Sequence, residues 1–122
     1  MLRRNLRLKQ KSHFRAIFTH GKSFSGRYVV IYVQNGPAKY GFIASKRVGS
    51  AVQRNRAKRL MREVVRRHLS ELKKEVQLIC IARSTLKGIS YVEVENSMLQ
   101  TLKRAGVITR DKESMFESSL ND

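Results

Sequence analysis

The chain has 122 residues, with 26 Lys and Arg against 9 Asp and Glu, a formal net charge of +17, and 41% hydrophobic residues. This length fits one domain, and the apolar content is enough for a buried core rather than for a disordered basic chain. No apolar run reaches the length of a transmembrane helix, and the basic N-terminus lacks the apolar stretch of a signal peptide. We therefore expect a cytoplasmic protein with no membrane partner.

The N-terminal part of the chain predicts a basic arm followed by a short helix. Residues 1–11 are rich in lysine and arginine, which predicts an extended basic arm at this end of the chain. Ser12 can cap a helix over residues 13–20, and Gly21 can end it. In that helix Phe14, Ile17 and Phe18 share one face, which fits core packing and, for the two phenylalanines, also a stacking surface for single-stranded nucleic acid.

Two strands follow this helix. Residues 28–34 are β-branched and aromatic, which is typical of a strand. After a turn at residues 35–37, residues 40–45 predict a strand that returns antiparallel to the first. Residues 22–27 can add a short edge strand.

The longest predicted helix covers about residues 51–72. It opens with a capping box formed by Ser50 and Gln53. An apolar stripe at helical spacing holds Ala57, Leu60, Met61, Val64, His68 and Leu72. The other side carries Asn55, Lys58, Arg59, Arg62 and Arg66, with Arg54 at the border. One side therefore packs on the sheet, and the other forms a cationic ridge.

The C-terminal part predicts one buried strand and one helix. Residues 76–82 are nearly all apolar, and Cys80 among them is expected to be a buried, unreactive thiol. A second capping box, Ser90 with Glu93, opens a helix that runs to about Ala105.

The predicted order α-β-β-α-β-α is that of an α/β (α+β) two-layer sandwich with a small mixed sheet. We expect a single RNA-binding domain with a basic arm at residues 1–11, a folded core at 12–106 and a flexible acidic tail at 107–122.

The positive charge lies almost entirely in the first half. Residues 1–62 hold 16 lysines and arginines and no acidic residue, whereas residues 63–122 hold 10 bases and 9 acids. The positive side chains of this half repel one another unless a bound polyanion neutralises them. We therefore expect an anionic partner, and we favour nucleic acid over an anionic membrane.

The sequence carries no sign of a catalytic or metal site of its own. A two-metal nuclease site needs clustered carboxylates, and the basic half has none. The three histidines, His13, His20 and His68, lack the spacing and the orienting acid of an acid–base pair. We expect no catalytic residue, no metal ligand and no cofactor bound by the protein itself.

The most informative motif lies in the long helix. It begins with Arg54, Asn55 and Arg56 and continues with Lys58, Arg59 and the pair Arg62–Glu63. Arginine forks, lysine charges and an asparagine amide on a rigid helix can bind phosphates in a fixed register. Ion pairing within the helix does not explain this density, because Glu63 is the one acid between Arg54 and Arg67.

This motif resembles that of the bacterial ribonuclease P protein family. Weaker matches elsewhere are Phe14, Phe18, His20, Gly21, Gly41, Ser45, Lys46, Arg47, Ile81, Ala82 and Arg83. The resemblance covers roughly residues 5–105 and implies a left-handed β-α-β crossover. The family often has more bases after its last helix, whereas this chain has an acidic C-terminus.

The resemblance implies a role in removing the 5′ leader of precursor tRNA, as the protein subunit of a ribonucleoprotein whose RNA subunit holds the catalytic Mg²⁺. The residues expected to bind the RNA subunit are Arg54, Asn55, Arg56, Lys58, Arg59 and Arg62. The residues expected to line a cleft for the leader are Phe14, Phe18, Tyr32, Lys46 and Ile81. The residues expected to give supporting basic contacts are Arg7, Arg47 and Arg66. The expected partners are ribonuclease P RNA and precursor tRNA, with a protein monomer in a 1:1 complex.

Two other functions remain open from the residues alone. A structural RNA-binding protein of ribosomal type fits the size, charge and fold class equally well. A DNA-binding regulator fits less well, because the segment before the basic helix is a strand and no dimer seam is visible.

Overall fold

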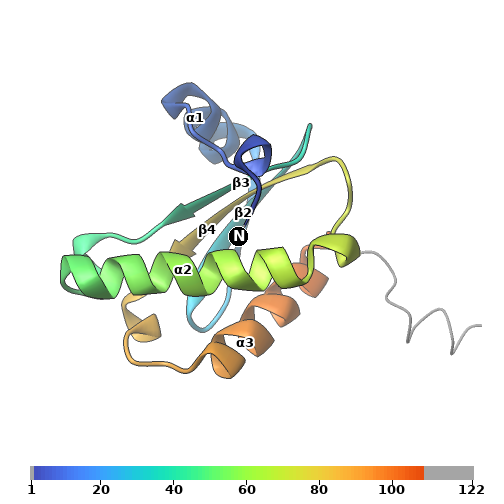
Figure 1. Cartoon of the computed structure of the whole chain (residues 1–122). Helices are drawn as coiled ribbons and strands as arrows, with labels where there is room; N and C mark the ends of the chain where they lie inside the picture. The colour runs from blue at the N-terminus through green and yellow to red at the C-terminus, as the bar shows by residue number, and fades with distance from the viewer. Residues whose placement is uncertain (1, 109–122) are drawn as a thin grey trace, which may run out of the picture.

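The computed structural model describes residues 2–108, which fold into three α-helices and a four-stranded sheet (Figure 1). The elements in chain order are α1 (Lys11–His20), β1 (Lys22–Ser25), β2 (Val29–Asn35), β3 (Lys39–Ile43), α2 (Ala51–Arg67), β4 (Val76–Ala82) and α3 (Tyr91–Arg104). The predicted α+β architecture is confirmed, and the short edge strand is present as β1. Every helix among these residues is too short or too polar to cross a membrane.

The strand order is β1-β2-β4-β3. Strand β2 pairs antiparallel with both β1 and β4, and β3 pairs parallel with β4. The predicted return strand therefore does run antiparallel to β2, but β4 lies between them. The reason is that β4 is the most apolar strand, so the central position, with a partner on each edge and cover on each face, suits it best.

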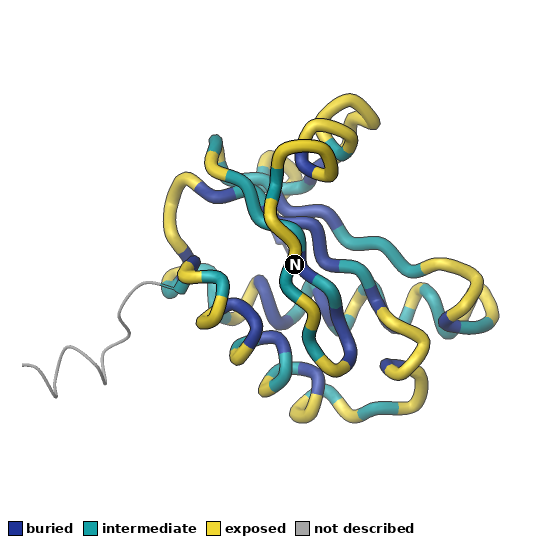
Figure 2. Tube along the Cα trace, turned by 180° about the vertical axis from the view of Figure 1, so that it is seen from behind, coloured by how far each residue is buried: buried dark blue, intermediate teal, exposed yellow. Residues whose placement is uncertain are grey.

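The sheet has two differently covered faces. Helices α2 and α3 pack on one face, where Ile31, Leu78 and Cys80 belong to the main core cluster. Helix α1 packs on part of the other face and contributes Ile17 to a smaller cluster with Ile79. Most of α1 is exposed (Figure 2). Burial raises the pKa of the Cys80 thiol to about 12, as expected of an unreactive core cysteine.

The N-terminal segment is not a separate arm, contrary to the sequence prediction. Leu2 and Leu8 are buried, and the Leu8 N–H donates to the Tyr40 carbonyl at 2.9 Å. Arg7 pairs with Tyr40 as an isolated parallel bridge. The two leucines give this basic segment enough apolar surface to cover the outer edge of β3.

The folded body also extends past residue 106 at the other end. Val107 is buried, and Ile108 pairs with Leu72. The rest of the expected tail lies outside the described residues.

Two helix boundaries differ from the prediction. Helix α1 begins at Lys11 after Gln10, which gives no side-chain cap, so Ser12 lies inside the helix rather than at its start. Helix α2 ends at Arg67 instead of near residue 72, and a 3₁₀ turn, Leu69–Glu71, follows it.

Of the two predicted capping boxes, one is complete and the other is half formed. The Ser50–Gln53 capping box is complete, with both hydrogen bonds present. At α3 the Ser90 hydroxyl caps the Glu93 N–H, while the Glu93 carboxylate accepts from the Tyr28 hydroxyl instead.

His68, at the end of α2, joins α2 to α3. Its Nδ1 lies 2.6 Å from Glu71 Oε2, and its Nε2 lies 2.9 Å from Glu95 Oε2. Glu95 also accepts from the Tyr91 hydroxyl, and the Arg67 guanidinium lies over the Tyr91 ring. Burial lowers the pKa of His68, but the hydrogen bonds to Glu95 and Glu71 outweigh burial, so the pKa is raised overall.

We predict that His68→Gln costs more stability in mild acid than in mild base. Because the folded-state pKa of His68 is raised, the protonated ring stabilises the fold below its ordinary value of 6.5, and this is lost as the pH rises through the folded value. The hydrogen bond from His68 lowers the pKa of Glu95, so its contribution is present above 4.5. Urea unfolding at about pH 5.5 and about pH 8.5 should show the larger difference from wild type at the lower pH.

A matched control is His13→Gln, which alters an exposed histidine of α1. Its effect should not follow the same pH trend. Equal losses for His68→Gln at both pH values would show that the ring acts by packing alone.

Candidate nucleic-acid interface

Helix α2 carries the predicted cationic ridge on the side away from the core. Ala57, Met61 and Val64 are fully buried, while Asn55 and Arg59 are exposed. Within the described residues, no acidic side chain forms an ion pair with the bases at positions 54–62. The ridge is therefore a row of uncompensated positive charge.

Two arginines of the ridge are held by backbone carbonyls. Arg54 Nη1 donates to the Gly49 carbonyl at 3.0 Å, and Arg56 Nη2 donates to the Ile89 carbonyl at 2.9 Å. Each guanidinium has five N–H donors, so one such bond leaves donors for a phosphate. These bonds orient the two side chains before any ligand binds.

Arg62 differs from the rest of the ridge. Its guanidinium lies 5.6 Å from the centre of the Phe42 ring, and its buried Nε has no hydrogen-bond partner among the described residues. Burial and the nearby charge of Arg7 lower the pKa of Arg62. Arg62 thus faces the N-terminal segment, at the border of the ridge rather than at its centre.

Arg66 is less available than expected. It is hydrogen-bonded to Glu63, and Arg67 lies 3.8 Å from the same carboxylate. Glu63 thus neutralises part of the charge at the C-terminal end of α2.

The predicted aromatic residues meet between α1 and the sheet. The rings of Phe18 and Tyr32 are 4.9 Å apart with planes 85° apart, and Phe18 is 38% exposed. Phe14 and Ile81 are half-buried beside the small cluster around Ile17. The prediction that Ile17 is core is confirmed, while both phenylalanines keep accessible surface.

Register explains how the sheet underlies this aromatic surface, which we define by Phe14, Phe18, Tyr32 and Ile81 and call the cleft. Ile81 pairs with Ile43 across β3 and β4, and both side chains belong to the small cluster. Ile43 was missed in the sequence, although alternation along the strand could have found it. Lys46 and Arg47 follow β3 in a 3₁₀ turn, Lys46–Val48, and both are exposed.

Phe14 approaches β3 closely because position 41 is glycine. A Cβ built on Gly41 would lie 2.6 Å from Phe14 Cε1 and 3.2 Å from Leu8 Cδ2. The missing side chain at this position therefore sets how closely the first ring of the cleft packs on the sheet.

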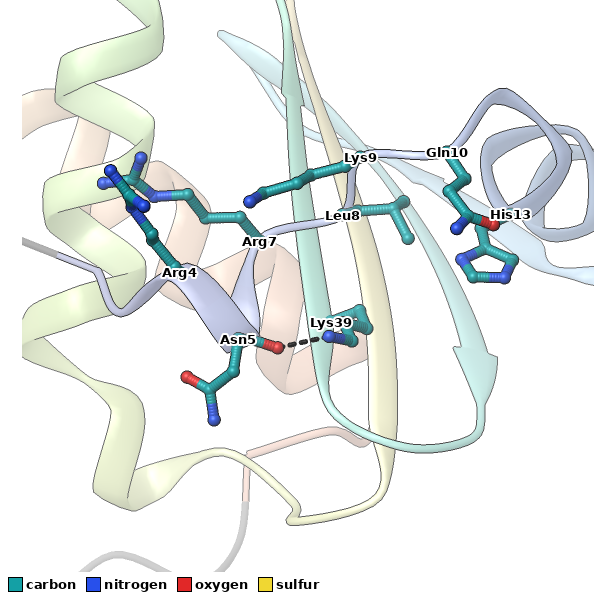
Figure 3. Close-up of a pocket in the computed structure, with 8 residues that line it drawn as sticks. All are labelled: Arg4, Asn5, Arg7, Leu8, Lys9, Gln10, His13 and Lys39. Carbon is teal, nitrogen blue, oxygen red and sulfur yellow. Dashed lines mark hydrogen bonds between the residues drawn. The ribbon is translucent and has the colours of Figure 1, made fainter.

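The N-terminal segment adds a basic cavity of about 330 Å³ (Figure 3). Arg4, Arg7, Lys9, His13 and Lys39 line it, and no acid does. Lys39 Nζ donates to the Asn5 carbonyl and so ties the segment to β3 (Figure 3). Only Arg7 was identified from the sequence; the others converge because the segment folds back along β3.

The described residues hold no group of three His, Cys, Asp or Glu side chains arranged for a metal ion. What they hold is a basic ridge on one helix, a basic cavity and an aromatic cleft. Cations bind phosphates of any sequence, and aromatic rings stack on any base. The fold and this surface are those of a nucleic-acid-binding α+β domain.

Comparisons with known proteins identify the family. The family model for ribonuclease P matches residues 2–106. The ribonuclease P protein component of Clostridium kluyveri is 41% identical over 106 residues, covering 83% of this chain and 95% of that protein. The chain belongs to the ribonuclease P protein family, the protein component of an endoribonuclease complex that processes tRNA.

Solved structures agree with this assignment. The ribonuclease P protein of Staphylococcus aureus superposes with a TM-score of 0.78 at 32% identity, covering 85% of this chain and 98% of that one. The protein from Thermotoga maritima gives 0.73 at 28% identity, with 80% and 96% covered.

We predict that Gly41→Ala destabilises the protein by about 1–3 kcal/mol, because the new methyl group overpacks the Phe14 ring. Urea unfolding measures the loss. In a Phe14→Leu background the same substitution should cost less, since the smaller side chain can move aside. Equal costs in both backgrounds would show that Phe14 is not the group that Gly41 accommodates.

Proposed function

We propose that this protein binds the RNA subunit of ribonuclease P and the 5′ leader of precursor tRNA, in a 1:1 complex in the cytoplasm, and assists removal of the leader. The observation that carries this proposal is the presence of two chemically different surfaces on one rigid body. The ridge of α2 offers exposed cations, whereas the cleft offers the partly exposed rings of Phe18 and Tyr32.

The ridge suits a folded RNA. Arg54 and Arg56 are oriented by backbone carbonyls, and Asn55 and Arg59 extend into solvent beside them. A rigid row of donors binds phosphates at fixed spacing, which selects a backbone shape rather than a base sequence. We assign Arg54, Asn55, Arg56, Lys58, Arg59 and Arg62 to the RNA subunit.

The cleft suits a single strand of variable sequence. Phe18 and Tyr32 offer ring surface to unstacked bases, and Lys46 offers a charge to the backbone. A protein that handles many precursors needs this tolerance, since leaders differ in sequence.

Bond cleavage is assigned to the RNA subunit and its Mg²⁺. Among the described carboxylates, Glu63 engages Arg66, and Glu71 and Glu95 engage His68. In this proposal the contribution of the chain is to bind and orient RNA and to neutralise its charge.

The proposal predicts that cleavage of precursor tRNA at low Mg²⁺ needs both this protein and the ribonuclease P RNA. Replacing Arg54, Arg56 and Arg59 together by Ala should weaken binding to the RNA subunit. It should also flatten the slope of log K against log salt by about 2–3, since three phosphate contacts are removed. Filter binding over a salt series and cleavage assays measure these two effects.

The matched control replaces Lys74, Lys87 and Lys103, three exposed bases outside the ridge, and removes the same charge. Its slope should stay near that of wild type. Equal slopes for the two triple variants would contradict the assignment of the ridge. Cleavage by the protein alone would contradict the assignment of chemistry to the RNA.

Phe18→Ala tests the cleft. Because Phe18 is 38% exposed, its loss should cost little stability. It should lower affinity of the holoenzyme for precursor tRNA by about fivefold or more, and for mature tRNA hardly at all, because one base loses a stacking partner. Val92→Ala, an exposed apolar truncation on α3, is the control. Equal losses for precursor and mature tRNA would remove Phe18 from the leader site.

A further inference from the structure

A second groove, of about 650 Å³, lies across strand β1 from the cleft. Lys22 and Phe24 of β1 line it, while Ser23 between them pairs with Tyr32 of the cleft. Successive strand residues point to opposite faces, so β1 separates the two sites by the thickness of one strand.

The titratable side chains that line this groove are all basic: His20, Lys22, Lys73 and Arg104. They come from four segments, the ends of α1 and α3, strand β1 and the loop before β4. Arg104 Nη2 donates to the Ser25 carbonyl, which holds the end of α3 against β1 and leaves the other guanidinium donors for a ligand.

Phe24 is the aromatic side chain of this groove. It is half-buried but belongs to neither apolar cluster. Its ring therefore keeps surface on which a base can stack.

A single glycine links the groove to the cleft. Helix α1 carries Phe14 and Phe18 into the cleft and ends at His20 in the groove. A Cβ at Gly21 would lie 2.5 Å from the Ile17 carbonyl and 2.8 Å from the Val33 carbonyl. The close turn at Gly21 therefore leads directly from one site to the other.

We propose that this groove binds nucleotides of the precursor leader that lie beyond the cleft. The inference rests on the proposed function and deepens it. Lys22, Lys73 and Arg104 contact phosphates, and Phe24 stacks on a base. A strand of RNA leaving the cleft passes the start of β1, next to Gly21, to reach them.

The test uses the reconstituted holoenzyme and one tRNA body with a series of leaders, from a few nucleotides to lengths well beyond the cleft. Cleavage at subsaturating enzyme gives kcat/KM for each, and wild type should favour long leaders over short ones. Phe24→Leu, which keeps apolar volume, should reduce that long-to-short ratio by about fivefold. Lys22→Ala with Lys73→Ala should also reduce the ratio and flatten the salt slope for long leaders by about 1.4.

Lys74→Ala with Lys103→Ala is the matched control, because both are exposed neighbours of groove residues and do not line the groove. Its long-to-short ratio should equal that of wild type. No preference for long leaders in wild type, or a preference that the groove variants retain, would overturn the inference. A loss of affinity for the RNA subunit alone would overturn it too, since the groove would then serve the other partner. Failure of the proposed function has a different signature: wild type would not promote cleavage even with a short leader.

Discussion

Electrostatic repulsion among the lysines and arginines of the first 62 residues is the constraint on which the rest of the structure depends. These residues include the N-terminal segment, three of the four strands and most of α2, yet they contain no acid. The fold must therefore bring many like charges together by apolar contacts and hydrogen bonds, without ion pairs to acids of this half. It does so by burying Leu2, Leu8 and the inner side of α2 while the charged heads stay at the surface. Arg62 shows this crowding locally, because burial and, to a smaller extent, the nearby charge of Arg7 lower its pKa.

The described acids are used where they tie the C-terminal half together. Glu71 and Glu95 hold His68 at the junction of α2 and α3, and Glu93 accepts from the hydroxyl of Tyr28, the residue before β2. As a result, no acidic side chain among the described residues forms an ion pair with the arginines and lysines at positions 54–62 of α2. A polyanion that binds to this surface neutralises part of its positive charge. Binding therefore lowers the repulsion within the folded state and stabilises the fold.

Local patterns predicted the elements well and their assembly less well. The Ser50–Gln53 cap, the buried strand around Cys80 and the stripe of α2 follow from short-range periodicity, and all are present. The insertion of β4 between β2 and β3 depends on long-range pairing, which the apolar pattern of β4 favours but does not specify. The density of charge in the N-terminal segment predicts an arm, but the segment also contains two leucines, and both pack on the core. Ile43, the basic cavity and the groove required the register of the sheet, so the sequence alone could supply only part of each site.

The central position of β4 connects these observations. Strand β4 is paired on both edges, and its two faces belong to different clusters. Leu78 and Cys80 lie in the main core, while Ile79 and Ile81 lie in the small cluster beneath the cleft. A core on one face holds α2 and its ridge in a fixed orientation relative to the aromatic cleft on the other. If the RNA subunit and the leader must be held at a set angle to each other, a single strand buried between them is the shortest rigid link. The edge strand β1 repeats this division at smaller scale. Its Ser23 lies beside Tyr32 of β2 on the side of the cleft, and its Lys22 and Phe24 line the groove on the other side, so a strand of RNA that follows the cleft would meet a second basic surface at that edge.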